Sequence, residues 1–208
     1  MKIGLCIESS TRAKAPALAA ALENAGLDYI SIGMTGADNE PELNYVQTGF
    51  LSALFLNLGI VDFVVGGCST GQGYLNAVLQ FPGTSAGLVL DSVDAFLFSQ
   101  VNGGNVVSLA LNKGYGTFGA ELNLEYIFEK LFSAPLGGGY PKHRAEAQRI
   151  SRGMLAEIAQ IGHRPMLEIL QRMDVAFIKH CIGFGNNLDY VRNAPPSEEK
   201  DFILGLFK

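Results

Sequence analysis

A thiol and two hydroxyl side chains stand together in a glycine-rich segment near the middle of this 208-residue chain. The segment reads GGCSTGQG over residues 66–73 and follows an apolar, β-branched run at 61–65. Such a run is typical of a buried strand, and helix-like sequence begins directly after the glycines. A strand, a glycine turn and a helix in this order bring backbone N–H groups together where a phosphate or a developing oxyanion can bind. We therefore predict an anion-binding turn, with Cys68 beside it as an acid/base or a nucleophile.

Two other interpretations of the turn are open, and a third fails. Residues 67–71 follow the spacing of the Gly-x-Ser-x-Gly nucleophile elbow of serine hydrolases, between a strand and a helix. That fold needs more than two preceding strands, and the three histidines of the chain fall in segments expected to be helices or breaks: His143, His163 and His180. The dinucleotide fingerprint Gly-x-Gly-x-x-Gly fails, because Asn76 stands in place of its third glycine. The last interpretation is a structural turn with a buried, inert cysteine.

The elements that would position this turn alternate between strand and helix through the first two-thirds of the chain. Strands are expected at 3–7, 29–32, 61–65, 86–90 and 106–111. Helices are expected at 13–24, in a segment that ends at Leu58, and at 74–80, 93–101 and 118–132. This alternation predicts an α/β fold with a doubly wound, five-stranded parallel sheet and helices on both faces. In such sheets the ligand lies at the carboxyl ends of the strands, where Cys68 is expected.

Beyond the α/β domain, expected over residues 1–150, the segment 151–208 is predicted to be a mainly helical extension that packs on the core or on a partner subunit. A helical pattern runs through 144–173, with a break expected at His163-Arg164-Pro165, because proline disfavours helix at the residue before it. Residues 174–181 suit either a further helix or a short strand.

Composition and charge narrow the classes of function. No apolar run reaches the roughly 18 residues of a membrane span, and the first residues do not resemble a signal peptide. A net charge of −5 without a basic stripe argues against nucleic acid. The cysteines Cys6, Cys68 and Cys181 are odd in number and lack a Cys-x-x-Cys pair, which favours reduced thiols and a cytoplasmic protein. No cluster of His, Cys and Asp has metal-ligand spacing, so no metal is expected.

The apolar content of the chain suggests a subunit interface. Hydrophobic residues make up 48% of the sequence, which covered parallel strands and an extensive interface would explain. The expected helix before Leu58 is apolar on nearly all sides, including Phe50, Leu51, Leu54 and Phe55. We therefore expect a homodimer or homotetramer.

Three motifs together resemble one family over residues 1–150. They are the turn CSTGQG after the third strand, the segment NGGNVV at 102–107, and the glycines 137–138 followed by Lys142-His143-Arg144. In this combination the chain resembles the type B ribose-5-phosphate isomerases and the galactose-6-phosphate isomerases, whose turn reads Cys-Gly-Thr-Gly-x-Gly.

The resemblance implies aldose–ketose isomerisation of a small phosphorylated sugar through a cis-enediolate, without a cofactor. It implies that Cys68 moves the carbon proton, that Thr70 and the turn N–H groups hold the oxyanion, and that basic residues beyond the sheet bind phosphate. Besides the catalytic Cys68 and Thr70, the expected substrate-binding residues are Glu8, Ser9, Arg12, Gly67, Ser69, Gly71, Gln72, Gly73, Asp91, Asn102, His143 and Arg144. Arg149 is an alternative to Arg144 as the phosphate ligand.

The departures from the family pattern bear on the substrate. The Asp-His pair of the family is Glu8-Ser9 here, and the family's ring-opening histidine corresponds to Leu90. Leucine cannot move a proton. Either the substrate needs no ring opening, or Asp91 or Ser9 performs it, or the chain is a non-catalytic sugar-phosphate-binding relative. Arg12 could replace the lost histidine as a phosphate ligand; the alternative is a solvated surface arginine.

Overall fold

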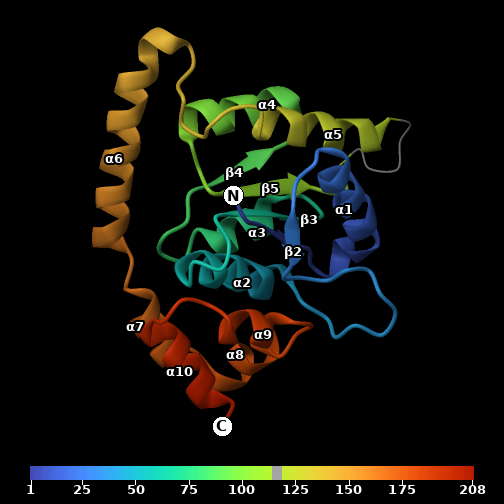
Figure 1. Cartoon of the computed structure of the whole chain (residues 1–208), viewed down its shortest axis with the longest axis vertical. Helices are drawn as coiled ribbons and strands as arrows, with labels where there is room; N and C mark the ends of the chain where they lie inside the picture. The colour runs from blue at the N-terminus through green and yellow to red at the C-terminus, as the bar shows by residue number, and fades with distance from the viewer. Residues whose placement is uncertain (114–118) are drawn as a thin grey trace.

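The computed structural model describes residues 1–113 and 119–208 (Figure 1). Its sheet has five parallel strands in the order β2-β1-β3-β5-β4. The strands are β1 Ile3–Cys6, β2 Tyr29–Ser31, β3 Phe63–Cys68, β4 Ala86–Val89 and β5 Val106–Ala110. Each predicted run thus overlaps a strand, although β3 begins and ends later than the predicted run 61–65, and the predicted doubly wound α/β class is confirmed.

Helices cover both faces of the sheet. One face carries α1 Ala15–Asn24, α4 Ser92–Leu97 and α5 Ala120–Leu131, and the other carries α2 Tyr45–Asn57 and α3 Gln72–Val78. The helix expected at 118–132 is α5, although the predicted start at residue 118 lies outside the described residues. Two short helices fall inside connections, the 3₁₀ helix η1 Ser9–Lys14 and the π-helix η2 Phe98–Asn102.

Local sequence explains where α2 begins. The side chain of Asn44 accepts hydrogen bonds from the N–H groups of Val46 and Gln47, and the Gln47 side chain accepts one from the N–H of Asn44. This capping box satisfies backbone donors that the first turn of a helix leaves without partners. The capping box therefore fixes the start of α2 at Tyr45, a residue that lies close to the glycine turn.

The segment after the sheet is helical, as predicted. It contains η3 Lys142–Arg144, α6 Ala145–Gly162, α7 Met166–Arg172, α8 Val175–Ile182, α9 Asn187–Arg192 and α10 Glu198–Leu206. The predicted break at His163–Pro165 separates α6 from α7, and the segment left open between helix and strand is the helix α8. Residue 150, where the α/β domain was expected to end, lies inside α6.

The C-terminal helices cover the outer side of α2. Phe50 packs edge-on against Phe177 of α8, with ring centroids 5.5 Å apart, and Phe55 meets Tyr190 of α9 at 6.2 Å. One apolar cluster joins the sheet, α2 and α7–α10. The all-round apolar character of α2, which suggested a subunit interface, is therefore explained by cover from the same chain.

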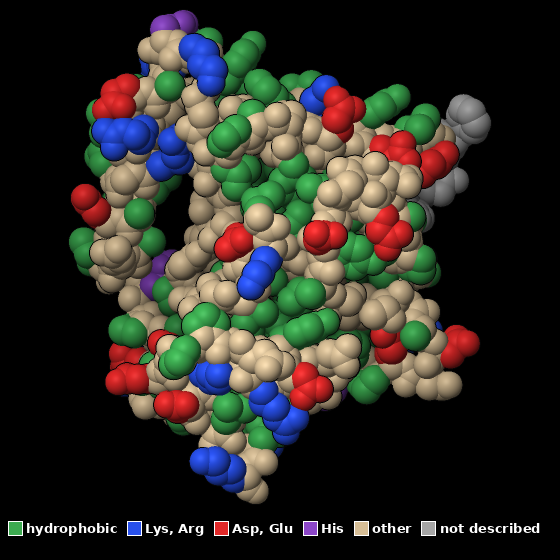
Figure 2. All heavy atoms as spheres, in the orientation of Figure 1, with side chains coloured by type: hydrophobic (Ala, Val, Ile, Leu, Met, Phe, Trp, Pro, Cys, Tyr) green, Lys and Arg blue, Asp and Glu red, His purple; other side chains and the backbone are tan. Residues whose placement is uncertain are grey.

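In contrast, α6 stands apart from the body of the molecule. Its 18 residues extend over about 27 Å, and none of them is buried. Figure 2 shows an opening between α6 and the sheet domain. Large apolar side chains of this helix are more than half exposed: Ile150, Met154, Leu155, Ile158 and Ile161.

Candidate active site

The carboxyl ends of β1 and β3 meet at the switch point of the sheet. From β1 the chain continues to β2 on one side, whereas β3 lies on the other side of β1. Open α/β sheets bind their ligands in the crevice outside this point. Glu8 follows β1 and Cys68 ends β3, so the topology brings these two predicted site residues to the same edge.

Cys68 is held in place by the backbone on both of its sides. Its carbonyl accepts hydrogen bonds from the N–H of Gly71, at 3.2 Å, and from the N–H of Leu111, at 3.0 Å. Its side chain is a free thiol, and the residue is 6% exposed. The turn and the end of β5 thus fix a thiol close to the edge where the ligand is expected.

The segment around Cys68 requires glycine at two positions. Gly67 lies so close to β5 that a Cβ atom would stand 2.3 Å from the carbonyl oxygen of Leu109. Gly71 has φ of 74°, in the left-handed region that L side chains rarely adopt. These two glycines let the chain turn sharply from β3 into α3.

The hydrogen bonds of the turn differ from the prediction. The N–H of Gly71 is bonded to the carbonyl of Cys68, and the N–H of Gln72 donates to the exposed Thr70 hydroxyl at 3.3 Å. Of the N–H groups of residues 71–73, which the resemblance implied as anion donors, two are therefore used within the turn, because a tight turn satisfies its own backbone groups first. The N–H of Gly73, in the first turn of α3, has no partner in the helical ladder and remains the donor suited to an oxyanion.

Glu8 anchors a set of polar side chains across the mouth of the site. The residue is 4% exposed, and its carboxylate accepts hydrogen bonds from the N–H and the hydroxyl of Ser10. Ser10 is linked to Ser69 of the turn at 2.8 Å between hydroxyl oxygens, and Asn112 donates to the Ser69 hydroxyl at 2.6 Å. The loops after β1, β3 and β5 are thereby joined by side chains.

The remaining predicted residues of this first loop point to different roles. The Ser9 hydroxyl donates to the carbonyl of Leu43 at 2.8 Å, so it ties η1 to the segment before α2 rather than to the turn. Arg12 is exposed in η1, and within the described parts of the chain no hydrogen bond or ion pair holds its guanidinium. Lys14, which sequence reasoning missed, donates to the carbonyl of Leu111 at 2.6 Å, and partial burial lowers its pKa.

Tyr45 is a second residue that sequence reasoning missed. A Cβ atom on Gly73 would stand 3.2–3.4 Å from its ring, so the aromatic face forms a wall beside the turn. Tyr45 is 45% exposed and can therefore meet a ligand. The capping box fixes Tyr45 in the first turn of α2. The sequence pattern of this box is only a weak signal that Tyr45 lies beside the glycine turn.

Asp91 has a structural role at the start of α4. Its carboxylate accepts hydrogen bonds from the N–H groups of Val93 and Asp94, both at 2.9 Å, which is the arrangement of a helix N-cap. Leu90 precedes it, exposed, after β4. Because β5 lies between β3 and β4, Asp91 and Leu90 are two strand positions from Cys68, about 10 Å across the sheet.

Asn102, His143 and Arg144 are not brought to the turn within one chain. Asn102 precedes β5 and so lies at the amino edge of the sheet, whereas Cys68 lies at the carboxyl edge. The glycine segment before η3 is bonded to η2, since the N–H groups of Gly137 and Gly139 donate to the carbonyls of Ser99 and Gln100. His143 and Arg144 follow it, exposed, at the start of α6.

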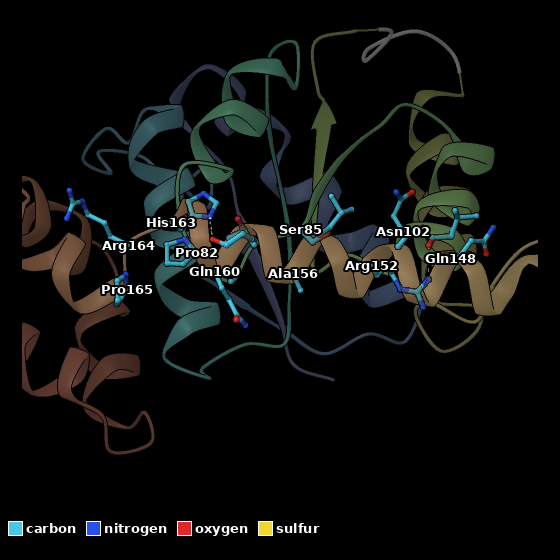
Figure 3. Close-up of a pocket in the computed structure, with 17 residues that line it drawn as sticks. Pro82, Ser85, Asn102, Gln148, Arg152, Ala156, Gln160, His163, Arg164 and Pro165 are labelled. Carbon is cyan, nitrogen blue, oxygen red and sulfur yellow. Dashed lines mark hydrogen bonds between the residues drawn. The ribbon is translucent and has the colours of Figure 1, made fainter.

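A cavity of about 780 Å³ separates α6 from this amino edge (Figure 3). Asn102, Gln148 and Arg152 line one end of the cavity, and His163 and Pro165 line the other. The Arg152 guanidinium donates to the carbonyls of Val101 and Gly137, at 2.9 and 3.0 Å. The predicted site residues therefore fall into two groups at opposite edges of the sheet.

The described part of the chain shows neither a metal-binding cluster nor a membrane-spanning helix. Within residues 1–113 and 119–208, no group of three or more His, Cys, Asp or Glu side chains could hold a metal ion. Over the same residues, no helix has both the length and the apolar content needed to cross a membrane.

Together, the fold and the turn define a doubly wound α/β protein with a thiol-bearing candidate site at the switch point of its sheet. Residues 3–150 match the family model described as Ribose/Galactose Isomerase. The chain therefore belongs to the ribose/galactose isomerase family, as its motifs predicted.

Solved structures agree with this assignment. A 4-deoxy-L-threo-5-hexosulose-uronate ketol-isomerase, crystallised with a tartrate, is 41% identical with a TM-score of 0.93, over 100% of this chain and 99% of that one. A ribose-5-phosphate isomerase from Vibrio parahaemolyticus is 36% identical with a TM-score of 0.92, over 99% of both chains. The type B ribose 5-phosphate isomerase of Leishmania infantum, at 19% identity and a TM-score of 0.63 over 77% of this chain and 97% of that one, shares the fold. Comparison with curated proteins returned no match.

Proposed function

We propose that this protein is a ketol isomerase that interconverts an open-chain aldose bearing a terminal acid group with the corresponding ketose. The observation that carries the proposal is the Cys68 thiol beside a glycine turn at the switch point, in a chain of a sugar isomerase family. As a thiolate, Cys68 takes the proton from C2 of the aldose and returns it to C1. Donors placed before the reaction then stabilise the enediolate oxygen.

The described residues supply these donors. The N–H of Gly73 and the hydroxyl of Thr70 face the developing oxyanion, and Tyr45 closes the side of the site next to Gly73. Arg12 and Lys14, on η1 at the same edge, supply the positive charge for the terminal acid group of the substrate. No step of this scheme requires a cofactor.

Leu90 and the uronate isomerase of 41% identity favour an open-chain substrate. A 4-deoxy sugar has no hydroxyl at C4, and a 5-ulose has a carbonyl at C5, so neither oxygen can close a five- or six-membered hemiacetal on C1. An enzyme for such a uronate needs no ring-opening histidine, and leucine is acceptable at position 90. We therefore propose a 4-deoxy-5-oxo uronate as the substrate class, supported by the 41% identity over both full lengths.

A small sugar phosphate is the second candidate. The basic residues Lys142, His143 and Arg144 stand exposed before α6, and the ribose-5-phosphate isomerase from Vibrio parahaemolyticus is 36% identical. With this substrate the ring would open without enzymatic help.

We further propose that a second copy of the chain completes the site, in a homodimer or a dimer of dimers. The predicted ligand residues Asn102, His143 and Arg144 lie at the edge opposite Cys68, and α6 exposes an apolar stripe next to them.

The three free cysteines suit a cytoplasmic protein.

The substrate is tested by comparing kcat/KM for four aldoses. They are the 4-deoxy-5-oxo uronate, erythrose 4-phosphate, ribose 5-phosphate and a six-carbon aldose phosphate. We expect the uronate to be used best, and Leu90→His to raise the rate only on substrates that form rings. A preference for the six-carbon aldose phosphate would contradict the open-chain proposal, and binding without turnover of any of the four would favour a non-catalytic relative.

A further inference from the structure

Four polar side chains form a continuous hydrogen-bonded chain from the mouth of the site to a buried carboxylate. Asn112 donates to the Ser69 hydroxyl at 2.6 Å, Ser69 and Ser10 lie 2.8 Å apart through their hydroxyl oxygens, and Ser10 donates to Glu8. Ser10 is exposed and Ser69 half-buried, whereas Glu8 is buried. The chain thus leads inward from the crevice beside Cys68.

The direction of every hydrogen bond follows from the groups involved. An amide NH₂ only donates and an ionised carboxylate only accepts, so both ends of the chain are fixed. Ser10 gives its only hydroxyl proton to Glu8, and it must therefore accept from Ser69. Ser69 then donates its own proton to Ser10 and accepts the hydrogen bond of Asn112 with one oxygen lone pair. Its second lone pair is available to a hydroxyl of a bound substrate.

The free lone pair of Ser69, with the relay behind it, meets a requirement of the isomerisation that Cys68 cannot meet. Conversion of an aldose to a ketose moves one proton from C2 to C1 and a second proton from O2 to O1. A thiol that moves the carbon proton leaves the oxygen proton to another group. In the turn Cys-Gly-Thr-Gly-x-Gly of the isomerases that this chain resembles, the residue after the cysteine is glycine, which has no hydroxyl. Ser69 is therefore a departure of this chain from that motif.

We propose that Ser69, backed by Ser10 and Glu8, is the relay that transfers the hydroxyl proton of the substrate. This inference rests on the proposed isomerase function and deepens it. Ser69 is the member that contacts the substrate, and Ser10 and Glu8 are positioning residues behind it. Asn112 holds the Ser69 hydroxyl in the orientation that points its proton toward Ser10.

The proton transfers balance over one turnover. Cys68 takes the C2 proton, and the electrons of the C–H bond form the C1–C2 double bond while the carbonyl electrons move to O1. The O2 proton passes to Ser69, the Ser69 proton to Ser10, and the Ser10 proton to Glu8. The same path in reverse delivers a proton to O1. Cys68 then returns its proton to C1 as C2 becomes the carbonyl, and both the thiolate and the carboxylate are restored.

The test separates exchange at carbon from completed isomerisation. In deuterated water, the enzyme is given the 4-deoxy-5-oxo uronate, or ribose 5-phosphate if that is the aldose used, and two products are measured. They are the ketose formed and the deuterium incorporated at C2 of the recovered aldose. An enediolate that cannot pass on its hydroxyl proton returns to labelled aldose, so a broken relay raises the ratio of label to product.

Ser10→Ala interrupts the relay without altering either end. We expect ketose formation to fall about 10²-fold, and the ratio of label to product to rise at least about tenfold, since Cys68 and the turn are unchanged. Ser10→Thr, which keeps a hydroxyl, should restore most of the turnover. Ser69→Gly, which installs the residue of the resembled motif, should raise the same ratio.

Ser133→Ala is the matched control, because its hydroxyl also donates to a neighbour, the carbonyl of Lys130, but lies after α5. It should leave both measurements unchanged. If Ser10→Ala and Ser69→Gly lower label and product in equal proportion, or not at all, in the presence of an active wild type, the relay is wrong. A wild type that converts none of the aldoses overturns the proposed function and the relay with it, and this result is seen before any variant is measured.

Discussion

Cys68 differs from the two other thiols of the chain in its surroundings. Cys6 lies on β1 and Cys181 on α8, and both are fully covered by the apolar cluster around α2. Burial raises the pKa of each of these thiols to about 12, because a low-dielectric surrounding disfavours the thiolate. They therefore stay protonated near neutral pH, which leaves Cys68 as the candidate thiol for the proposed proton transfer.

Replacing Cys68 tests its role directly. In Cys68→Ala, kcat should fall by roughly 10²–10⁴-fold, the usual contribution of a general acid/base group. Binding of the acid group should largely survive, since Arg12 and Lys14 are untouched, and calorimetry with a substrate analogue measures it. Cys181→Ala is the control: it should keep kcat while lowering stability. Unchanged turnover in Cys68→Ala would transfer the role to a carboxylate such as Glu8.

Sequence could predict the residues of the site only where the signal is local. Cys68, Thr70 and their glycines lie within one short motif, whose strand–turn–helix context can be read directly. The relay is different, because Ser10 and Ser69 are 59 residues apart and meet only after β1 and β3 pair. Asn102 shows the opposite case, since its motif was visible but its place at the far edge of the sheet was not.

At the scale of elements, the apolar pattern predicted which strands and helices are buried, but not which segment covers them. Parallel strands buried on both faces appear as continuous apolar runs, which is why all five strands of the sheet were found. The same reasoning showed that α2 is covered on every side. The prediction took this as a sign of a subunit interface and left open whether the C-terminal extension packs on the core or on a partner subunit. In the structure, α7–α10 cover the outer side of α2. The sequence could not show this, because a helical pattern such as that of α8 does not indicate which surface the helix will contact.

The junction of β1, α2 and α8 predicts a loss of stability at alkaline pH. The folded-state pKa values of Cys6 and Cys181 are about 12, above the ordinary value of 9.0. The stabilisation is therefore complete below about pH 9 and is lost as the pH rises toward 12, with an upper bound of about 4 kcal/mol per thiol. Urea unfolding between pH 8 and 11 measures this decline.

Removing one thiol should make the decline shallower. In Cys6→Ala, the free energy of unfolding should fall less steeply with pH, by up to one proton, even though the variant is less stable at neutral pH. Ser133→Ala, which changes a surface hydroxyl, should retain the wild-type slope. An identical slope in Cys6→Ala would mean that ionisation of this thiol does not limit alkaline stability.

At the scale of the whole molecule, two observations point to a second copy. Ile150, Met154, Ile158 and Ile161 recur at intervals of three or four residues along α6, so they form one exposed apolar stripe. Beside this helix lies the cavity lined by Asn102, at the edge opposite Cys68. A two-fold dimer could bring the Asn102 edge of one chain to the Cys68 edge of its partner, and would bury the stripe.

Light scattering at micromolar concentration should therefore find a dimer or a tetramer. Ile158→Lys, in the middle of the stripe, should shift the protein toward monomers and lower turnover, since a charge would be buried at the interface. Val175→Lys, on the exposed side of α8, is the matched control and should change neither property. A monomeric wild type would refute the predicted assembly.

Mixing two inactive variants tests whether the site is shared between copies. Cys68→Ala lacks the acid/base residue and Asn102→Ala lacks the proposed hydroxyl ligand, so each alone should have little turnover. If each site takes Cys68 from one chain and Asn102 from the other, half of the randomly mixed dimers each contain one intact site. The mixture should then recover about a quarter of the wild-type turnover. Recovery requires subunit exchange, which mass spectrometry of an isotopically labelled partner confirms. Exchanged dimers without recovered turnover would show that Asn102 does not act across the interface.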